Sequence, residues 1–281
     1  MLIENNLFGV VDKVAVALEL LKKYEPPEGY YVCFSGGKDS VVILDLVKRA
    51  GVKYEAWHNI MTIEPPELMQ FIFKKYPEVQ HTHPKTTMYQ LIKRLGYPPL
   101  RYARYCCSKL KQVPGKNRLK VTGVRAAESK KRAQHPQFEK ANNGGYFLKP
   151  IFYWSDAEVW EYIRKYNVEY CKLYDEGSKR IGCVLCPFAN AKKISDDLKR
   201  YPQFARYFLT ACRAAIKNRL AQGKDIKYKT GDELFAMFIN RDRKIKDFSG
   251  VTFDFVDGKL VRYNAKTPAE CSNEISLFTA E

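Results

Sequence analysis

Six consecutive residues, 35–40, have the types and the spacing to bind an anion. They read Ser-Gly-Gly-Lys-Asp-Ser and lie between a strand-like run at 30–34 and the apolar run 41–44, which predicts the start of a helix. Glycines let the backbone approach a ligand closely, and N–H groups before a helix N-terminus point toward negative charge. Lys38 adds a full charge, and the two serines add hydroxyl donors. The loop therefore predicts binding of a phosphate or sulfate group.

Four of the eight cysteines form a second pattern, with the chemistry of a metal site. Cys106 and Cys107 are adjacent, and Cys183 and Cys186 are separated by two residues. Thiolates are soft ligands, and four of them suit zinc or an iron–sulfur cluster. Side chains of adjacent residues diverge, which is awkward around one zinc ion and easier at the separate iron atoms of a cubane. The spacing favours a 4Fe–4S cluster, with zinc and unmetallated thiols as the alternatives.

An alternation of strand-like and helix-like segments must position both patterns. The predicted strands are 30–34, 53–58, 79–83, 118–124 and 147–152, and the predicted helices are 7–24, 41–50, 67–75, 87–95 and 155–166. This βα repeat predicts an α/β fold with a doubly wound, mainly parallel sheet. Ligands of such sheets bind beyond the carboxyl ends of the strands. Loop 35–40 and segments 59–67 and 122–132 are expected to meet there.

The chain beyond residue 190 is expected to be mainly helical. Two or three helices are predicted between residues 192 and 240, followed by a hairpin over 247–263 with Asp257-Gly258 at its turn. The earlier segment 136–145 contains Asn-Asn-Gly-Gly and is expected to form a loop. We therefore expect two domains. Residues 1–190 would form the α/β nucleotide-binding domain with the cysteine pattern, and residues 191–281 a helical region with the hairpin and a polar tail.

Charge and hydrophobicity limit the classes of partner. The 281 residues include 48 Lys and Arg against 31 Asp and Glu, a formal net charge of +17. Such a surface favours polyanions, either nucleic acid or a multiply charged nucleotide. No apolar run reaches the ~18 residues of a membrane span, and the first residues lack the pattern of a signal peptide. We expect a cytoplasmic protein with no membrane partner, whose cysteines serve metal or redox chemistry rather than disulfides.

Several motifs, taken together, are similar to those of one known family. Loop 35–40 resembles the S-G-G-x-D-S loop of the PP-loop ATP pyrophosphatase superfamily. Residues 123–132 resemble G-[IV]-R-x-x-E-S-x-x-R, residues 150–160 resemble P-[IL]-x-x-W-x-x-x-x-[VI]-W, and residues 173–183 resemble L-Y-x-x-G-x-x-R-I-G-C. The cysteine pattern resembles the 4Fe–4S ligand set of assimilatory adenylyl-sulfate reductases. Over about residues 28–190 the chain is thus similar to the phosphoadenosine phosphosulfate (PAPS) reductase family, and most similar to its cluster-containing adenylyl-sulfate reductases.

The resemblance implies an adenine nucleotide alpha-hydrolase-like fold with its site at the loop. In the family the loop holds the pyrophosphate of ATP or the phosphosulfate of a sulfonucleotide. By position, the implied nucleotide- or phosphosulfate-binding residues are Ser35, Gly36, Gly37, Lys38, Asp39, Ser40, Thr62, Glu64, Arg125 and Arg132. Thr62 and Glu64 fall in a degenerate form of the family's T-G-x-E-x-P-E segment. The implied cluster ligands are Cys106, Cys107, Cys183 and Cys186.

The resemblance also implies two catalytic residues. Lys111 looks like the family lysine that lies between cluster and substrate. The family reductases carry a C-terminal E-C-G-[IL]-H whose cysteine attacks the sulfur of the sulfonucleotide, after which thioredoxin or another thiol reductant releases sulfite. Glu270 and Cys271 occupy a comparable place, so Cys271 is the implied nucleophile. The glycine and the histidine of that motif are missing.

Three functions are consistent with these patterns. The first is thiol-dependent reduction of adenylyl sulfate, or of PAPS, to sulfite, with a 4Fe–4S cluster beside the site. The second is ATP-dependent adenylation or sulfur transfer onto nucleic acid, as in DNA phosphorothioation or tRNA thiolation, which the positive charge and the altered tail favour. The third is a non-catalytic nucleotide-binding module. The cysteine spacing and the arginine motif favour the first, which is our leading interpretation.

Overall fold

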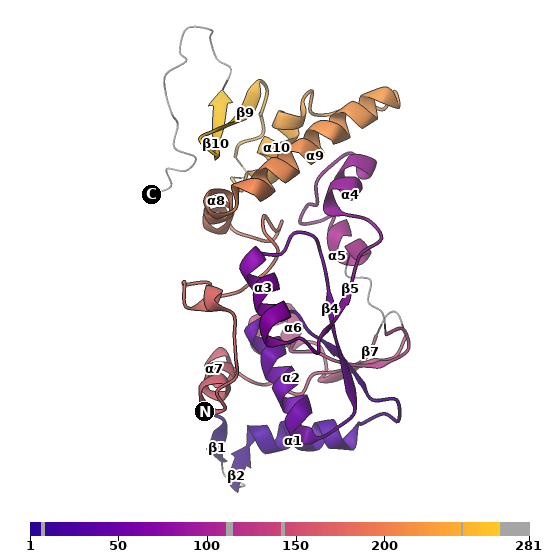
Figure 1. Cartoon of the computed structure of the whole chain (residues 1–281), viewed down its shortest axis with the longest axis vertical. Helices are drawn as coiled ribbons and strands as arrows, with labels where there is room; N and C mark the ends of the chain where they lie inside the picture. The colour runs from indigo at the N-terminus through magenta and orange to yellow at the C-terminus, as the bar shows by residue number, and fades with distance from the viewer. Residues whose placement is uncertain (7–8, 111–114, 142–143, 243, 265–281) are drawn as a thin grey trace. The chain divides into compact units, whose positions relative to one another are not determined.

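The computed structural model (Figure 1) describes residues 1–6, 9–110, 115–141, 144–242 and 244–264. Its contacts divide the chain into two compact units. The first comprises the described residues of Met1–Ile60, Pro65–His83 and Gln112–Gly182, and the second those of Met61–Glu64, Pro84–Lys111 and Cys183–Glu281. The expected domains, 1–190 and 191–281, stay a prediction, because compactness does not test independent folding. The two divisions differ at residues 61–64, 84–111 and 183–190, whose described residues lie in the second unit.

The first unit is built on a six-stranded sheet. Its strands lie in the order β5-β4-β3-β6-β8-β7, and all run parallel except β7, which is antiparallel to β8. The strands are β3 (Tyr30–Cys33), β4 (Tyr54–Asn59), β5 (Gln80–Thr82), β6 (Leu119–Val121), β7 (Phe138–Lys140) and β8 (Tyr146–Leu148). Tyr30, Tyr31 and Val32 of β3 are all buried, as expected of a parallel strand covered on both faces. The predicted α/β fold with a mainly parallel sheet is confirmed.

The order of the strands reverses at the central strand β3. The chain leaves β3 for β4 on one side and later adds β6 on the other side, so that Val32 pairs with both Ala56 and Val121. In open parallel sheets, the carboxyl ends of the strands at such a reversal leave a crevice for a ligand. The segments that follow β3 and β6 are therefore neighbours at one edge of the sheet.

Helix α2 (Lys38–Ala50) is the central helix of the first unit. Its residues 41–44 are fully buried, and it packs against α1 (Lys13–Lys23) and α7 (Asp156–Lys165). It ends at Gly51, which adopts the left-handed conformation, with φ of 69°, that terminates many helices. The unit also contains α3 (Pro66–Lys75), α6 (Lys130–Ala133) and two 3₁₀ turns, Ala126–Glu128 and Lys172–Tyr174.

The second unit is mainly helical. Its helices are α4 (Met88–Leu95), α5 (Tyr105–Leu110), α8 (Ala191–Arg200), α9 (Pro202–Ala221) and α10 (Gly231–Ile239), and α9 packs against α4 and α10. Strands β9 (Val251–Val256) and β10 (Lys259–Asn264) form the predicted hairpin. Asp257 and Gly258 between them both have positive φ, as a tight hairpin turn requires. In the part of the chain that the structure describes, no helix is long and apolar enough to cross a membrane.

The N-terminal segment differs from the prediction of one helix over 7–24. Helix α1 begins only at Lys13, because Asp12 caps it by accepting hydrogen bonds from the N–H groups of Val14 (2.8 Å) and Ala15 (3.2 Å). Ahead of this helix, strands β1 (Ile3–Asn6) and β2 (Gly9–Asp12) pair in antiparallel orientation. The apolar residues between 7 and 24 predict one helix, but Asp12 caps the helix and so sets its start at Lys13.

The predicted loop 136–145 also differs, because it contains the edge strand β7. The ring of Phe138 stacks on Tyr24, with 5.1 Å between ring centroids, and on Tyr146, with 5.2 Å. Tyr24 is distant in sequence, so this stabilisation of the strand was not visible in the local turn residues.

Glu158 links the start of helix α7 to helix α1. The residue is 3% exposed, and its carboxylate accepts hydrogen bonds from Lys13 Nζ (2.8 Å) and from the N–H of Ser155 (2.7 Å). Burial alone would raise the pKa of this carboxyl, but the hydrogen bonds outweigh burial and lower the pKa from 4.5 to about 2. The charged carboxylate therefore stabilises the fold above the unfolded-state pKa, and this contribution is lost as the pH falls toward the folded-state value.

We expect Glu158→Gln to lower the free energy of unfolding at neutral pH by roughly 1–3 kcal/mol, with the difference from the wild type shrinking as the pH falls from about 4.5 to about 2. Urea unfolding at a series of pH values measures this difference. Glu19→Gln, at an exposed position of α1, is the control and should stay close to the wild type throughout. A Glu158→Gln deficit that is constant with pH would contradict the assignment.

Candidate functional site

The loop between β3 and α2 is the centre of the candidate site. Gly36 has φ of 72°, and a Cβ at this position would lie 2.7 to 2.8 Å from side-chain atoms of Leu68 and Ile72. Only glycine fits, because it tolerates positive φ and has no Cβ to clash. Gly37 has no side chain to cap helix α2, which leaves the first N–H groups of the helix to other partners. The backbone thus has the form expected of an anion-binding loop.

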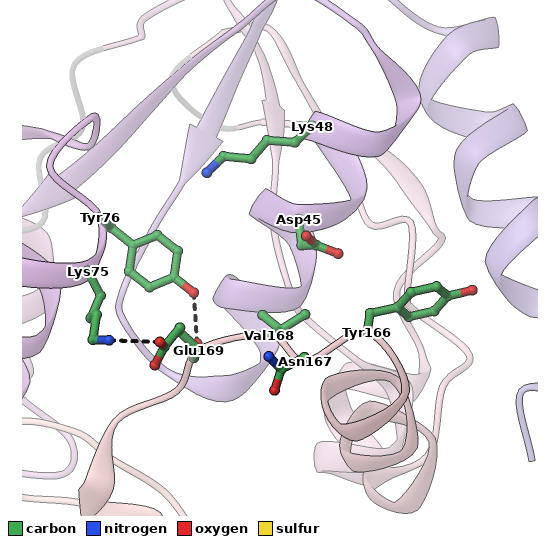
Figure 2. A pocket seen from close by; sticks show the side chains of 8 residues that line it. All are labelled: Asp45, Lys48, Lys75, Tyr76, Tyr166, Asn167, Val168 and Glu169. Atoms are coloured by element: carbon green, nitrogen blue, oxygen red, sulfur yellow. Dashed lines mark hydrogen bonds and ion pairs between the residues drawn. The ribbon is translucent and has the colours of Figure 1, made fainter.

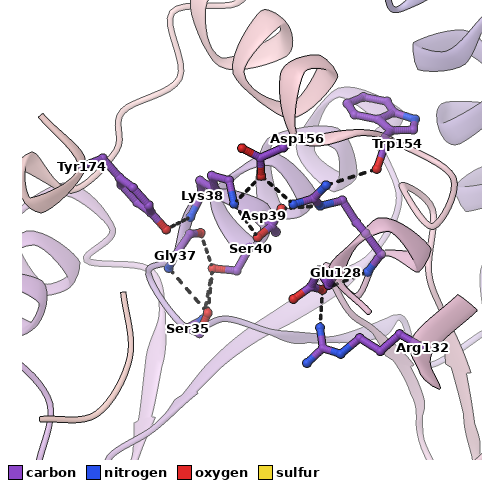
Figure 3. A network of polar contacts seen from close by, with 11 residues as sticks. Ser35, Gly37, Lys38, Asp39, Ser40, Glu128, Arg132, Trp154, Asp156 and Tyr174 are labelled. Carbon is purple, nitrogen blue, oxygen red and sulfur yellow. Dashed lines mark hydrogen bonds and ion pairs between the residues drawn. The ribbon is translucent and has the colours of Figure 1, made fainter. Parts of the chain in front are cut away.

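Two serine hydroxyls fix the conformation of this loop (Figure 3). Ser40 Oγ donates to the carbonyl oxygen of Gly37 (2.8 Å) and accepts from the N–H of Ser35 (3.2 Å). Ser35 Oγ donates to Ser40 Oγ (3.2 Å) and lies 3.5 Å from the N–H of Gly37. The hydroxyls that the sequence suggested as ligand donors therefore also bind one another, and their contact with a ligand stays a prediction.

Two buried cations lie beside the loop and share two carboxylates. Lys38 is 5% exposed, and its Nζ is 3.0 Å from Asp156 and 3.4 Å from Asp39. Arg125 is 3% exposed and reaches Asp39 through Nε (2.6 Å) and Asp156 through Nη2 (2.9 Å). Its Nη1 donates to the carbonyl oxygen of Trp154 (3.2 Å). The structure thus brings Lys38, Asp39 and Arg125 together, as the sequence predicted, and adds Asp156.

Asp156 differs from its partners because its side chain is 64% exposed. Partial burial would raise the pKa of its carboxyl, but the hydrogen bonds and charges of Lys38 and Arg125 outweigh that effect and lower the pKa. Asp156 is also the first residue of helix α7, where the helix dipole favours a negative charge. It is therefore a charged and accessible counter-ion of two buried cations.

Gly123 allows the segment after β6 to approach the loop. A Cβ at this position would lie 2.8 Å from the main-chain carbonyl carbon and oxygen of Asp39. Real Cβ atoms are not found so close to a backbone, so any other residue would push the two segments apart. This close approach places Arg125, two residues later, against Asp39.

Tyr174 closes the loop from a distant segment (Figure 3). Its hydroxyl oxygen accepts a hydrogen bond from the N–H of Lys38 (2.9 Å), the first residue of helix α2. Burial raises the pKa of this hydroxyl to about 12, so it stays protonated at neutral pH. Sequence reasoning did not single out Tyr174 or Asp156 as site residues. The L-Y-x-x-G motif and the helix start after Ser155 were the only local signals for them.

Arg132 takes a different partner from Arg125. It forms an ion pair with Glu128, four residues before it. Glu128 also accepts a hydrogen bond from the N–H of Arg125 (3.1 Å). Arg132 therefore helps to order the segment that carries Arg125, and its predicted contact with a ligand stays a prediction.

Thr62 and Glu64 lie in the second compact unit, whereas the loop lies in the first. The buried Glu64 accepts hydrogen bonds from the N–H groups of Met61 and Ile63, the latter at 3.1 Å. Thr62 has φ of 65°, and its hydroxyl accepts from the N–H of Met88 (3.3 Å). Both side chains thus support their own backbone, and their predicted role in nucleotide binding is not tested by these contacts.

All four cysteines of the predicted ligand set lie in the second unit. Cys106 and Cys107 lie on helix α5, where the first is buried and the second exposed. A hydrogen bond with Cys107, burial and the charges of Cys107 and Cys183 together raise the pKa of the Cys106 thiol. The segment with Cys183 is held by the N–H of Val184, which donates to the carbonyl oxygen of Ile63 (2.8 Å).

The metal prediction is not shown by this geometry. Among the residues that the structure describes, no three or more His, Cys, Asp or Glu side chains are grouped so that they could hold a metal ion. The two predicted catalytic residues, Lys111 and Cys271, lie outside the described residues. The cluster and both catalytic roles therefore stay predictions.

A pocket of about 150 Å³ in the first unit lies beside the second half of α2 (Figure 2). Its lining includes Asp45 and Lys48 of this helix. Tyr76 donates to the carbonyl oxygen of Glu169 (2.7 Å), and Lys75 pairs with the Glu169 carboxylate (2.7 Å). These contacts join α3 to the segment after α7, and we assign no ligand to this pocket.

We expect Gly123→Ala to lower the free energy of unfolding by about 1–3 kcal/mol, because the added methyl group collides with the backbone of Asp39. Gly182→Ala is the matched control, since its Cβ would meet no atom within 4 Å and its φ is not in the left-handed region. Chemical denaturation measures both. Equal stability of the two variants would show that the segment after β6 does not press on the loop.

Adenosine 5'-phosphosulfate reductases and an uncharacterized protein are among the known proteins that are similar to this chain. The adenosine 5'-phosphosulfate reductase of Allochromatium vinosum is 28% identical over 202 residues, which are 66% of this chain and 78% of that protein. The enzyme of the same name from Staphylococcus epidermidis is 28% identical over 201 residues, 64% of this chain and 80% of that protein. The uncharacterized protein MJ0066 of Methanocaldococcus jannaschii is 28% identical over 214 residues, 68% of this chain. The matched part is 43% of MJ0066, so the chain spans less than half of this relative.

Among solved structures, the phosphoadenylyl-sulfate reductase of Candida auris is similar, with a TM-score of 0.48 and 20% identity, over 59% of this chain and 87% of that one. The family model of the phosphoadenosine phosphosulfate reductase domain matches residues 29–189, more than half of the sequence. The matched region contains loop 35–40, Arg125 and the four cysteines of the predicted ligand set. The chain therefore belongs to the phosphoadenosine phosphosulfate reductase domain family.

Proposed function

We propose that this protein is a cytoplasmic sulfonucleotide reductase that converts adenylyl sulfate, or its 3'-phosphorylated form, to sulfite and the nucleoside phosphate. One observation carries the proposal. Two buried cations, Lys38 and Arg125, converge at the N-terminus of helix α2, beyond the carboxyl end of β3. This is where an open parallel sheet binds its ligand, and a phosphosulfate group carries the charge that these cations would neutralise.

On binding, the anionic group of the ligand would replace a carboxylate of the protein as the partner of Lys38 and Arg125. Asp156 is the more exposed of the two carboxylates that pair with Lys38 and Arg125, so it is the one that water can solvate when a ligand displaces it. Asp39, in contrast, belongs to the loop itself, and its backbone packs against Gly123. The phosphosulfate would then accept hydrogen bonds from the N–H groups of the loop and from both cations.

The chemical step needs a nucleophile and two electrons from thiols. In the proposed reaction the Cys271 thiolate attacks the sulfur atom, the bond between sulfur and the bridging oxygen breaks, and the nucleoside phosphate leaves with both electrons of that bond. The sulfonate is then attached to Cys271 through a sulfur–sulfur bond. Thioredoxin or another dithiol attacks the Cys271 sulfur, sulfite leaves, and the dithiol is oxidised to a disulfide as the free cysteine is restored.

Four cysteines would hold the cofactor, a 4Fe–4S cluster, in the second unit. The chemistry of the donor set fits, because Cys106, Cys107, Cys183 and Cys186 are soft thiol ligands. When bound, the cluster would contribute its charge, whereas the electrons for reduction come from the thiols. By family resemblance Lys111 would lie between cluster and substrate. Zinc on the same thiols is the alternative.

A second function is favoured by the charge of the chain. A formal net charge of +17, together with the missing glycine and histidine after Cys271, favours ATP-dependent adenylation or sulfur transfer onto nucleic acid. The loop would then bind ATP, and pyrophosphate would leave as the acceptor is adenylated. Release of pyrophosphate from ATP only in the presence of tRNA or DNA would favour this function. Nucleotide binding without either reaction would indicate a non-catalytic module.

Lys38→Ala should weaken the binding of adenylyl sulfate at least tenfold, which corresponds to roughly 1.4 kcal/mol, because a buried charge-assisted contact is lost. Isothermal titration calorimetry measures the affinity, in the Cys271→Ser background so that no turnover interferes. Lys48→Ala, on the same helix with a side chain that is 42% exposed, is the control and should bind like the parent. An unchanged affinity of Lys38→Ala would refute the assignment of the loop.

The proposed reaction is tested with anaerobically purified, cluster-loaded protein. With ³⁵S-labelled adenylyl sulfate and reduced thioredoxin, we expect labelled sulfite from the wild type and none from Cys271→Ser. Cys212→Ser is the matched control, because Cys212 is fully buried in helix α9, and it should retain sulfite release. Absence of sulfite from wild-type protein with an intact cluster would exclude the reductase, and sulfite release by Cys271→Ser would exclude this nucleophile.

A further inference from the structure

The second unit contains a pocket of about 500 Å³ that the proposed reaction does not use. Its walls come from residues 99–102, from the end of helix α10 and, among the described residues after this helix, from 240–242, 245, 246 and 248. Pro187, directly after the Cys-x-x-Cys motif, also lines it. The volume is within the range of about 300–1,000 Å³ that is usual for sites of organic ligands.

Aromatic rings paired with cations line much of this pocket. Phe238 and Phe248 are buried, and the guanidinium group of Arg241 lies 6.0 Å from the ring centroid of Phe238. Lys227 Nζ lies 5.6 Å from the centroid of Tyr228. An aromatic wall beside positive charge is the arrangement that holds a stacked base and its phosphate.

Among the residues that the structure describes, two arginines of the pocket donate to main-chain oxygens and form no ion pair with a carboxylate. Arg101 Nε donates to the carbonyl oxygen of Pro187 (3.0 Å), and Arg241 Nε donates to that of Ala189 (3.1 Å). Within the described parts of the chain, every hydrogen bond from these two guanidinium groups ends on a main-chain carbonyl oxygen. A carbonyl oxygen accepts a hydrogen bond but carries no net charge to cancel the cation.

The lining as a whole is strongly positive. It contains the four cations Arg101, Lys227, Arg241 and Lys246, against one carboxylate, that of Asp242. The pocket therefore favours a ligand that combines an aromatic ring with a negative charge.

We propose that this pocket binds one nucleotide of a single-stranded nucleic acid, with the base on the accessible rings of Tyr102 and Tyr228 and the phosphate at the arginine pair. A polymer is favoured over a free nucleotide because the same chemistry continues outside the pocket. Tyr102 at the rim is 88% exposed, and the neighbouring Phe188 is 51% exposed with Arg104 stacked 4.7 Å from its ring centroid. The net charge of +17 would attract such a strand. This inference does not depend on the proposed reductase activity.

The charge part is tested by fluorescence anisotropy with labelled 12-residue oligo(dT) and oligo(rU) and the full chain. Lys227→Glu/Lys246→Glu should bind at least tenfold more weakly than the wild type, because the positive charge of the lining falls, and the slope of log K against log salt should become less steep. The control Lys192→Glu/Lys199→Glu makes the same charge change at exposed positions of helix α8, outside the pocket. Equal weakening by the two double variants, or no binding of either strand at low salt, would overturn the proposal.

The aromatic part is tested with the same probes. Tyr102→Ser should weaken binding about tenfold, in the range of about 1–3 kcal/mol for one base stacked on an aromatic ring. The control Tyr153→Ser removes another exposed ring, 68% exposed in the first unit, and should bind like the wild type. Lys38→Ala should also bind normally, which separates this pocket from the loop. Unlabelled AMP is added at the same molar concentration of nucleotides as the labelled oligonucleotide. If it displaces the oligonucleotide completely, the pocket binds a free nucleotide and the proposal of a polymer is rejected.

Discussion

Burial of two positive charges at one edge of the sheet is the constraint on which the candidate site depends. A buried cation without a counter-ion costs several kcal/mol, so Lys38 and Arg125 require the carboxylates that surround them. Three separate parts of the chain must therefore converge: the loop after β3, the segment after β6 and the start of helix α7. The close packing of Gly123 on Asp39 and the start of α7 at Asp156 bring two of these parts to the loop.

The same pairing governs how the site can take up an anion. Two cations and two carboxylates have no net charge, so a ligand gains the full attraction of the cations only after a carboxylate withdraws. The exposure of Asp156 makes its withdrawal the less costly one, because water can replace the lost partners, whereas Asp39 is enclosed by the loop. The first N–H group of α2 also has an internal partner, because it already donates a hydrogen bond to the hydroxyl of Tyr174. A phosphate oxygen would have to replace this hydroxyl as the acceptor. The ligand binding that we propose at this loop would therefore replace internal partners.

Those features of the site that arise from neighbouring residues could be predicted from the sequence, and those that arise from distant contacts could not. The glycine-rich loop between β3 and α2, the helix start at Ser155 and the hairpin turn at Gly258 each have a local signature of residue type and spacing, and all three are found in the structure. Tyr174 lies 136 positions from Lys38, and no local pattern joins the two. Asp156 was visible only as the residue after a helix cap, because its role depends on cations from two other segments.

The second unit shows that positive charge alone does not indicate whether a basic residue binds the chain or a partner. Residues 183–190 form neither helix nor strand, so their carbonyl groups need donors from elsewhere, and Arg101 and Arg241 supply them. These arginines therefore have a structural role at the Cys-x-x-Cys segment. A guanidinium group, however, keeps its charge while it donates to neutral oxygens, in contrast to Arg125, whose charge is balanced by two carboxylates. The difference in counter-ions, rather than the number of basic residues, separates cations that are available to an anion from those that the fold already neutralises.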